Sequence, residues 1–301
     1  MINGTINRDQ GLIELKAPAK INLYLAVKGK RADGYHEIES LMQKIDLADR
    51  IQLRIGGQGI RLTCAGADLP TDEGNLAFRA ADAFLRKTGR SGVAITLEKK
   101  IPVAAGLGGG SSDAAAVLRG LNSLFAAELP DEELLALAKP LGADVPFFMY
   151  DWPAAWATGI GEELTPAASL ANCHLVLVNP GISVSTGWVY KNFALTSGSN
   201  TFILARGRQS RDSRSHWRPK MPEDLYNDLE AVTIPHYPEI EQIKNELRQD
   251  GAVGVLMSGS GPTVFGIFTD PDRAGRSVTR FGKVYGDKVF YTRPCQSGIS
   301  S

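Results

Sequence analysis

The 301-residue chain has no excess of either charge and only three cysteines. Its 33 basic and 33 acidic side chains cancel, so no overall field would attract nucleic acid or an acidic membrane surface. Cys64, Cys173 and Cys295 are odd in number and lie in no CxxC spacing, which argues against a disulfide framework or a zinc knuckle. These absences favour a protein of the reducing cytoplasm.

Long hydrophobic runs are also missing. No window holds about eighteen uninterrupted apolar residues, and the first ten residues lack the apolar centre of a signal peptide. We therefore expect neither secretion nor a membrane span. With 43% hydrophobic and 22% charged residues, the composition is that of a folded globular protein, and its length is sufficient for two domains.

Strand-like and helix-like segments are mixed along the chain, which predicts an α+β fold. Runs of branched residues flanked by Gly, Pro or charge predict strands at 21–27, 51–55, 93–97, 174–178 and 263–268. Helices are expected from the N-cap Asn75 to Gly89 and from Pro238 to Gly251, where apolar residues recur with helical spacing. Another helix should begin near Ser111.

Two segments interrupt this pattern. Residues 151–161, with Trp152, Pro153 and two glycines, are expected to connect two layers, and we place the boundary between domains 1–158 and 159–301 there. Residues 197–222 carry six basic side chains among Ser and Gly. They form either a flap over an anionic substrate or a solvated surface insertion, and the insertion is favoured because runs of charge usually face water.

A glycine-rich segment, PVAAGLGGGSS at 102–112, follows a predicted strand and precedes a predicted helix. Its four glycines, at positions 106, 108, 109 and 110, let the backbone turn sharply and bring N–H groups close to an anion. The helix start adds unpaired amides and the positive end of the helix dipole. We therefore predict that this segment cradles the phosphates of a nucleoside triphosphate.

The segment does not match the other common nucleotide motifs. No lysine follows the last glycine, as GxxxxGK[ST] requires, and GxGxxG read from Gly106 or Gly108 ends on Ser111 or Asp113. The HRD and DFG triplets of protein kinases are absent. A flexible linker is disfavoured by the preceding proline and strand and by the alanine-rich helix. Because Asp113 would repel phosphate, we expect its side chain to point away from the nucleotide.

Residues 102–115 resemble the second motif of the GHMP kinases, small-molecule kinases named for galactose, homoserine, mevalonate and phosphomevalonate. The usual form is PxxxGLGSSAA, and the longer GLGGGSSDAA of this chain is similar to that of the members acting on a cytidine-diphosphate-linked methylerythritol. Four other segments resemble further motifs of these members in the expected order: APAKINL at 17–23, RADGYH at 31–36, GADVP at 142–146 and SGSGPTVF at 258–265.

The resemblance implies a two-domain α+β architecture with the active site in the cleft between the domains. It also implies an ATP-dependent kinase that phosphorylates the 2-hydroxyl of a small-molecule substrate carrying a cytidine diphosphate, in the non-mevalonate route to isoprenoids. Mg²⁺ would accompany ATP, and no metal site of protein side chains is expected. By the same resemblance, the ATP-binding residues are Pro102, Val103, Ala104, Ala105, Gly106, Leu107, Gly108, Gly109, Gly110, Ser111 and Ser112.

For the chemical step, the resemblance assigns Asp144 as general base and Lys20 as the cation beside it, with Asn22 as a hydrogen-bond partner near the acceptor alcohol. Phosphoryl transfer needs these two kinds of group, a carboxylate for the proton and positive charge near the moving phosphoryl. Without the family context, Lys20 and Asn22 are more simply solvated strand residues, and Asp144 is a turn or cap residue.

At the other end of the substrate, the resemblance gives Tyr35 and His36 as the residues that hold the cytosine, by stacking and by hydrogen bonding. Tyr190 is a candidate for the opposite face of the ring, although a core aromatic is the plainer interpretation. Lys99 and Lys100 could lie along the nucleotide, but paired lysines near a turn are usually solvated.

Three competing functions remain open. Another GHMP kinase, acting on homoserine or a sugar, is disfavoured by the RADGYH segment. A non-catalytic nucleotide-binding regulator of the same fold is disfavoured by the presence of both Lys20 and Asp144. A Rossmann oxidoreductase fails on the register of its glycine motif. The sequence carries no signal for an oligomeric state.

Overall fold

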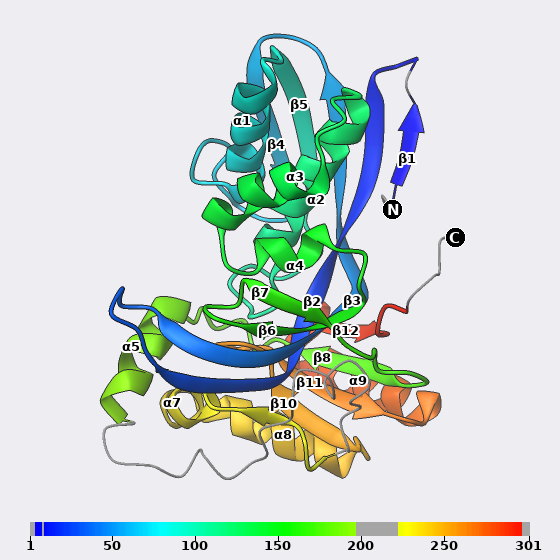
Figure 1. The fold of residues 1–301 in the computed structure, drawn as a ribbon. Helices are drawn as coiled ribbons and strands as arrows, with labels where there is room; N and C mark the ends of the chain where they lie inside the picture. Colours follow the sequence, from blue (N-terminus) through cyan, green and yellow to red (C-terminus); the bar gives the residue numbers. More distant parts are fainter. Residues whose placement is uncertain (1–3, 8, 197–221, 297–301) are drawn as a thin grey trace.

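The computed structural model describes residues 4–7, 9–196 and 222–296, so nearly all of the predicted basic segment 197–222 lies outside the described residues. Within those ranges, no helix is both long enough and apolar enough to cross a membrane. Figure 1 shows two lobes joined by the long strands β2 (Leu12–Lys30) and β3 (His36–Ile55).

The larger sheet has the strand order β1-β2-β3-β5-β4, with β6 and β7 continuing from β3 and with β9 beside β2. Its remaining strands are β1 (Gly4–Asn7), β4 (Gly59–Ala65), β5 (Gly92–Glu98), β6 (Ala154–Thr158), β7 (Glu163–Pro166) and β9 (Tyr226–Asn227). The helices of this lobe are α1 (Leu76–Thr88), α2 (Gly109–Leu124), α3 (Asp131–Ala138) and α4 (Val145–Met149), with a short 3₁₀ helix at Lys139–Leu141. Their apolar faces and the sheet enclose one core, which includes Leu53, Phe84 and Leu118.

The second sheet is antiparallel, in the order β10-β11-β8-β12. Its strands are β8 (His174–Val178), β10 (Gly254–Met257), β11 (Val264–Phe268) and β12 (Val289–Thr292). The helices around it are α5 (Thr186–Thr196), α7 (Glu230–His236), α8 (Glu239–Gln249) and α9 (Pro271–Tyr285), and a 3₁₀ turn at Gly286–Lys288 precedes β12. A separate core around Val178, Leu247 and Phe268 lies on this side.

A third apolar cluster joins the two lobes. It contains Ile21 and Leu41 from the long strands, Leu107 from the glycine-rich segment and Phe265 from β11, all at most 1% exposed. The base of the glycine-rich segment is therefore packed between β2 and the second sheet, and the residues beside it lie where the lobes meet.

Several predicted elements are confirmed. Helix α1 begins after Asn75, whose side chain accepts a hydrogen bond from Ala77 N, and ends at Gly89 in the left-handed conformation. Strand β8 has the predicted limits, and α8 lies between Pro238 and Gly251.

The interpretation of residues 151–161 as a plain connection is wrong. They contain β6, which pairs with β3 and whose residues Ala154–Ala157 are at most 6% exposed. A strand buried on both faces shows no alternation of apolar and polar residues, so its sequence gave no strand signal. The predicted domain boundary after residue 158 falls in the turn between β6 and β7, within one sheet, and it stays a prediction.

Candidate active site

The glycine-rich segment connects β5 to α2 by a turn that only glycine fits at Gly106 and Gly108. Both have positive φ, +74° and +69°. A Cβ on Gly106 would lie 2.1 Å from the carbonyl oxygen of Ser258, far inside contact distance. Helix α2 begins at Gly109, two residues before the predicted Ser111, and no side chain caps it. The amides of its first turn are therefore available to an anion.

The predicted ATP-binding residues differ in exposure and therefore in which of their atoms can contact a ligand. Ala105 and Leu107 are about as buried as any core residue, at 2% and 1% exposed, so only their backbones can face a ligand. Val103 is 52% exposed. The hydroxyl oxygen of Ser112 is buried without a hydrogen-bond partner among the described residues. An unsatisfied buried hydroxyl beside free amides fits an anionic ligand that would complete its bonding.

Lys20, Asn22 and Asp144 come together beside this turn. Lys20 Nζ donates a hydrogen bond to Asn22 Oδ1 at 2.7 Å and lies 3.4 Å from Asp144 Oδ2. Lys20 is also tied to the turn, because its backbone N–H donates to Leu107 O at 2.9 Å. The Asp144 side chain is one-third exposed and makes no capping bond to the helix α4 that follows it. Its carboxylate therefore faces Lys20 and is open to solvent on one side.

Asn22 is 3% exposed, which overturns the plainer interpretation of a solvent-facing strand residue. Its side-chain amide donates to Ser40 Oγ at 2.8 Å, and its backbone N–H donates to Ser258 Oγ at 3.3 Å. Ser258 Oγ in turn donates to Gly106 O at 2.9 Å. The second glycine turn, residues 258–261, thus touches both the first glycine turn and the Lys20–Asn22 pair.

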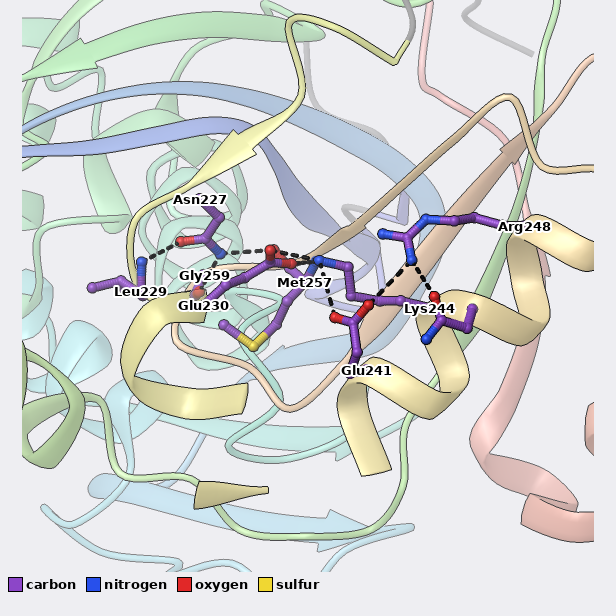
Figure 2. A network of polar contacts seen from close by, with 9 residues as sticks. Asn227, Leu229, Glu230, Glu241, Lys244, Arg248, Met257 and Gly259 are labelled. Carbon is purple, nitrogen blue, oxygen red and sulfur yellow. Dashed lines mark hydrogen bonds and ion pairs between the residues drawn. The ribbon is translucent and has the colours of Figure 1, made fainter. Parts of the chain in front are cut away.

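A buried polar network holds this second turn from the other side, and Figure 2 shows its members. Asn227 Nδ2 donates to the carbonyl oxygens of Met257 and Gly259, each at 2.8 Å. Glu230 accepts from Met257 N at 2.9 Å and from Lys244 Nζ at 2.5 Å. Sequence reasoning missed these supports, because their partners are up to 32 residues away and no local motif links them.

Beneath the first turn, Asp49, Lys99 and Asp113 form a buried charge cluster. Lys99 Nζ donates to both carboxylates, at 2.7 Å to Asp113, and all three side chains are at most 4% exposed. The expectation of a solvated Lys99 is therefore wrong; only Lys100 is exposed. Asp113 faces Lys99. Asp49 also accepts from the backbone N–H groups of Lys100 and Ile101, at 2.6 and 2.9 Å, and so fixes the start of the turn.

Two carboxylates share one ammonium in this cluster. Burial, together with the charge of Asp49, raises the pKa of Asp113 to about 7 against the opposing attraction of Lys99. Burial alone would lower the pKa of Lys99, but the charges and hydrogen bonds of the two carboxylates raise it overall. The ammonium therefore keeps its proton, and the raised pKa of Asp113 gives the cluster a proton equilibrium near neutral pH.

The residues predicted to hold cytosine are only partly assembled. Tyr190 stacks on His36, with ring centroids 5.3 Å apart and planes at 29°. Tyr35 is 61% exposed, and its placement on one face of the cytosine, with Tyr190 on the other, stays a prediction. His36 Nε2 is buried without a hydrogen-bond partner among the described residues, and burial together with Lys30 lowers the pKa of His36. Burial and the charge of Asp144 raise the pKa of Tyr190, which connects this end to the Lys20–Asp144 pair.

Comparison with known proteins identifies the family. The models of the GHMP kinases N terminal domain and the GHMP kinases C terminal match residues 75–151 and 214–287. A relative from Desulfotalea psychrophila, named 4-diphosphocytidyl-2-C-methyl-D-erythritol kinase, is 46% identical over 286 residues, covering 92% of this chain and 94% of its own. This chain belongs to the GHMP kinase family. A relative of the same name from Syntrophotalea carbinolica is 48% identical, covering 92% of this GHMP kinase and 97% of its own length.

Solved structures agree with this assignment. A 4-(cytidine 5'-diphospho)-2C-methyl-D-erythritol kinase superposes with a TM-score of 0.75 at 36% identity, covering 94% of this GHMP kinase and 99% of the other chain. A homoserine kinase from Cytophaga hutchinsonii, at 20% identity, has a TM-score of 0.68 over 97% of this chain and 96% of its own, and shows a shared fold. The α+β GHMP architecture and the kinase class predicted from the motifs are confirmed.

Proposed function

We propose that this GHMP kinase transfers the γ-phosphoryl group of ATP to the 2-hydroxyl of 4-diphosphocytidyl-2-C-methyl-D-erythritol. The observation that carries the proposal is the 3.4 Å separation of Lys20 Nζ and Asp144 Oδ2 beside a glycine turn whose helix amides are uncapped. Names of relatives at 46–48% identity supply the substrate. Lys20, Asp144 and the glycine turn would equally serve a kinase that acts on another alcohol. The identity of the acceptor therefore depends on the residues around His36.

In this mechanism, the substrate hydroxyl lies against Asp144. Its oxygen attacks the γ-phosphorus, its proton passes to the Asp144 carboxylate, and ADP leaves. The Lys20 ammonium faces the same point and offsets the negative charge that develops on the attacking oxygen and the transferred group. Asn22 holds Lys20 Nζ by its hydrogen bond at 2.7 Å, so the cation has a fixed position before substrates bind.

The phosphate chain of ATP would lie on the amides at the start of α2, with the Ser112 hydroxyl as a further contact. The fit is favourable because Gly106 and Gly108 keep the turn free of side chains, and because the Ser112 oxygen lacks a partner among the described residues. Mg²⁺ would accompany ATP and neutralise part of its charge, which requires few protein ligands. The described residues contain no cluster of three His, Cys, Asp or Glu side chains that could hold a metal ion.

The cytosine end of the substrate would lie against His36. The lowered pKa of His36 favours the neutral form of its imidazole. The Nε2 atom of His36, which has no partner among the described residues, can form one hydrogen bond with the edge of the base. Tyr35 is exposed, so its side chain can move onto one face of the cytosine ring. Tyr190 stacks on His36, and it would either leave that stack or extend it to the cytosine.

The experiment offers the purified chain ATP and Mg²⁺ with the cytidyl substrate, homoserine and galactose in parallel, and follows ADP release. We expect release with the cytidyl substrate alone. Faster turnover of homoserine or galactose would assign the chain to a different GHMP kinase. Tight ATP binding without turnover of any alcohol would favour a non-catalytic regulator.

A further inference from the structure

The carboxylate of Asp144 is carried by an unusually short helix. Helix α4, Val145–Met149, has five residues, too few for its own hydrogen bonds to stabilise it. Asp144 directly precedes it, and no side-chain cap fixes this end. The position of Asp144 therefore depends on contacts that α4 makes with other elements.

Two lysines on neighbouring strands contact the two ends of this helix. Lys20 of β2 and Lys44 of β3 are register partners in an antiparallel pair, so their side chains leave the same face of the sheet. Lys20 Nζ lies 3.4 Å from Asp144, at the start of α4. Lys44 Nζ donates a hydrogen bond of 2.5 Å to the carbonyl oxygen of Tyr150, directly after its end.

Burial of the Lys44 ammonium costs desolvation energy, which other contacts must offset. The residue is 8% exposed, and in the described part of the chain its ammonium donates to a neutral carbonyl oxygen rather than to a carboxylate. Besides Tyr150 O, its ammonium lies 4.9 and 5.8 Å from the ring centroids of Phe147 and Phe148, both on α4. Burial, with the nearby charge of Arg119, lowers the pKa of Lys44 to about 7. An apolar side chain would fill this space without that desolvation.

A second cation reinforces the same end. Arg119 of α2 donates from Nη1 to Met149 O at 2.8 Å and pairs with Asp151 at 2.8 Å. Positive charge near the last carbonyls of a helix is favourable, because those carbonyls carry its negative end. Both cations come from elements that build the site, since β3 pairs with the strand of Lys20 and α2 starts at the glycine turn.

We propose that Lys44 is a positioning residue that anchors the C-terminal end of α4 and so sets the position of Asp144 opposite Lys20. This inference rests on the proposed function, because it takes Asp144 as the base. Lys44 itself touches no reacting atom. A displacement of about 1 Å in a reacting group can lower the rate about 100-fold, so loss of the anchor is expected to appear in turnover rather than in nucleotide binding.

The test is a double-mutant cycle with Lys44→Met and Asp144→Asn, in which kcat and the KM for ATP are measured. Lys16→Met is the matched control, because Lys16 is on β2 and exposed. We expect Lys44→Met alone to lower kcat at least about tenfold with the KM for ATP within about twofold, and Lys16→Met to leave both unchanged. In the Asp144→Asn background, Lys44→Met should change kcat by less than about twofold, because the misplaced group is already inactive.

An equal fall of kcat in both backgrounds would overturn the proposal, since a general loosening of the fold acts whether or not Asp144 is present. A wild-type kcat for Lys44→Met would overturn it as well. If Asp144→Asn alone leaves kcat unchanged, the proposed base is wrong, and the role of Lys44 falls with it for that separate reason. Should Lys44→Met fail to fold, Lys44→Gln, which keeps a donor without the charge, takes its place in the same cycle.

Discussion

Replacing Asp113 by Asn should remove a loss of stability that the wild type shows as the pH rises. The wild type should therefore become less stable relative to Asp113→Asn between acid and alkaline pH. The wild-type cluster carries two carboxylates and one ammonium, all nearly inaccessible. The ordinary pKa of Asp113, 3.8, is raised to about 7 in the folded chain. Between these values the folded chain holds a proton that the unfolded chain has released, so wild-type stability falls as pH rises.

The magnitude follows from linkage. Each pH unit between the two pKa values removes about 1.4 kcal/mol, so from about pH 5 to about pH 8 the wild type should lose about 2–3 kcal/mol relative to Asp113→Asn. Urea unfolding at these pH values measures the difference. Glu98→Gln, which removes an exposed carboxylate paired with Lys100, is the control for the loss of a surface charge. A constant difference between the wild type and Asp113→Asn across this range would show that Asp113 is ionised throughout and would refute the reasoning.

Three other substitutions, the last with a matched control, test separate parts of the site and its supports. His36→Ala should raise the KM for the cytidyl substrate and leave the KM for ATP nearly unchanged; steady-state kinetics with each substrate varied tests this, and a parallel rise for ATP would contradict the assignment. Gly106→Ala should destabilise the chain by a few kcal/mol and weaken ATP binding, because its Cβ would lie 2.1 Å from Ser258 O at a φ of +74°; unchanged urea unfolding would argue against this packing. Glu230→Gln should lower the free energy of unfolding by about 2 kcal/mol, because the buried ammonium of Lys244 loses its 2.5 Å partner. Glu241→Gln, at 3.9 Å from the same ammonium, should cost less than half as much, and equal losses would count against the network.

Local signals in the sequence were sufficient to predict the elements whose ends carry residues with specific backbone preferences. Asn75 and Gly89 fix the limits of α1 by their own backbone preferences, and the branched run 174–178 coincides with β8. The long strands were underestimated, because polar residues such as Lys20 and Lys44 interrupt the apolar pattern inside β2 and β3. These polar residues lie where β2 and β3 run beside the candidate active site. Positions at which the apolar pattern of the strands breaks therefore coincide with functional positions.

The motifs located Lys20, Asp144 and the glycine turn but not what holds them. Asn22 N and Ser258 Oγ are 236 residues apart in the chain, and Lys44 is 106 residues from Tyr150. Such pairs depend on strand register and on the packing of one lobe against the other, which no local pattern specifies. Burial of Asn22 and Lys99 escaped prediction for the same reason, since polar side chains are usually exposed unless distant partners satisfy them.

The most direct test of the central claim is the effect of Asp144→Asn on turnover and on ATP affinity measured side by side. If Asp144 takes the proton of the acceptor while the glycine turn and the start of α2 hold the phosphates, kcat should fall about 100- to 10,000-fold, and the Kd for ATP from calorimetry should stay within about twofold. Unchanged kcat, or an ATP affinity that falls together with kcat, would contradict the account.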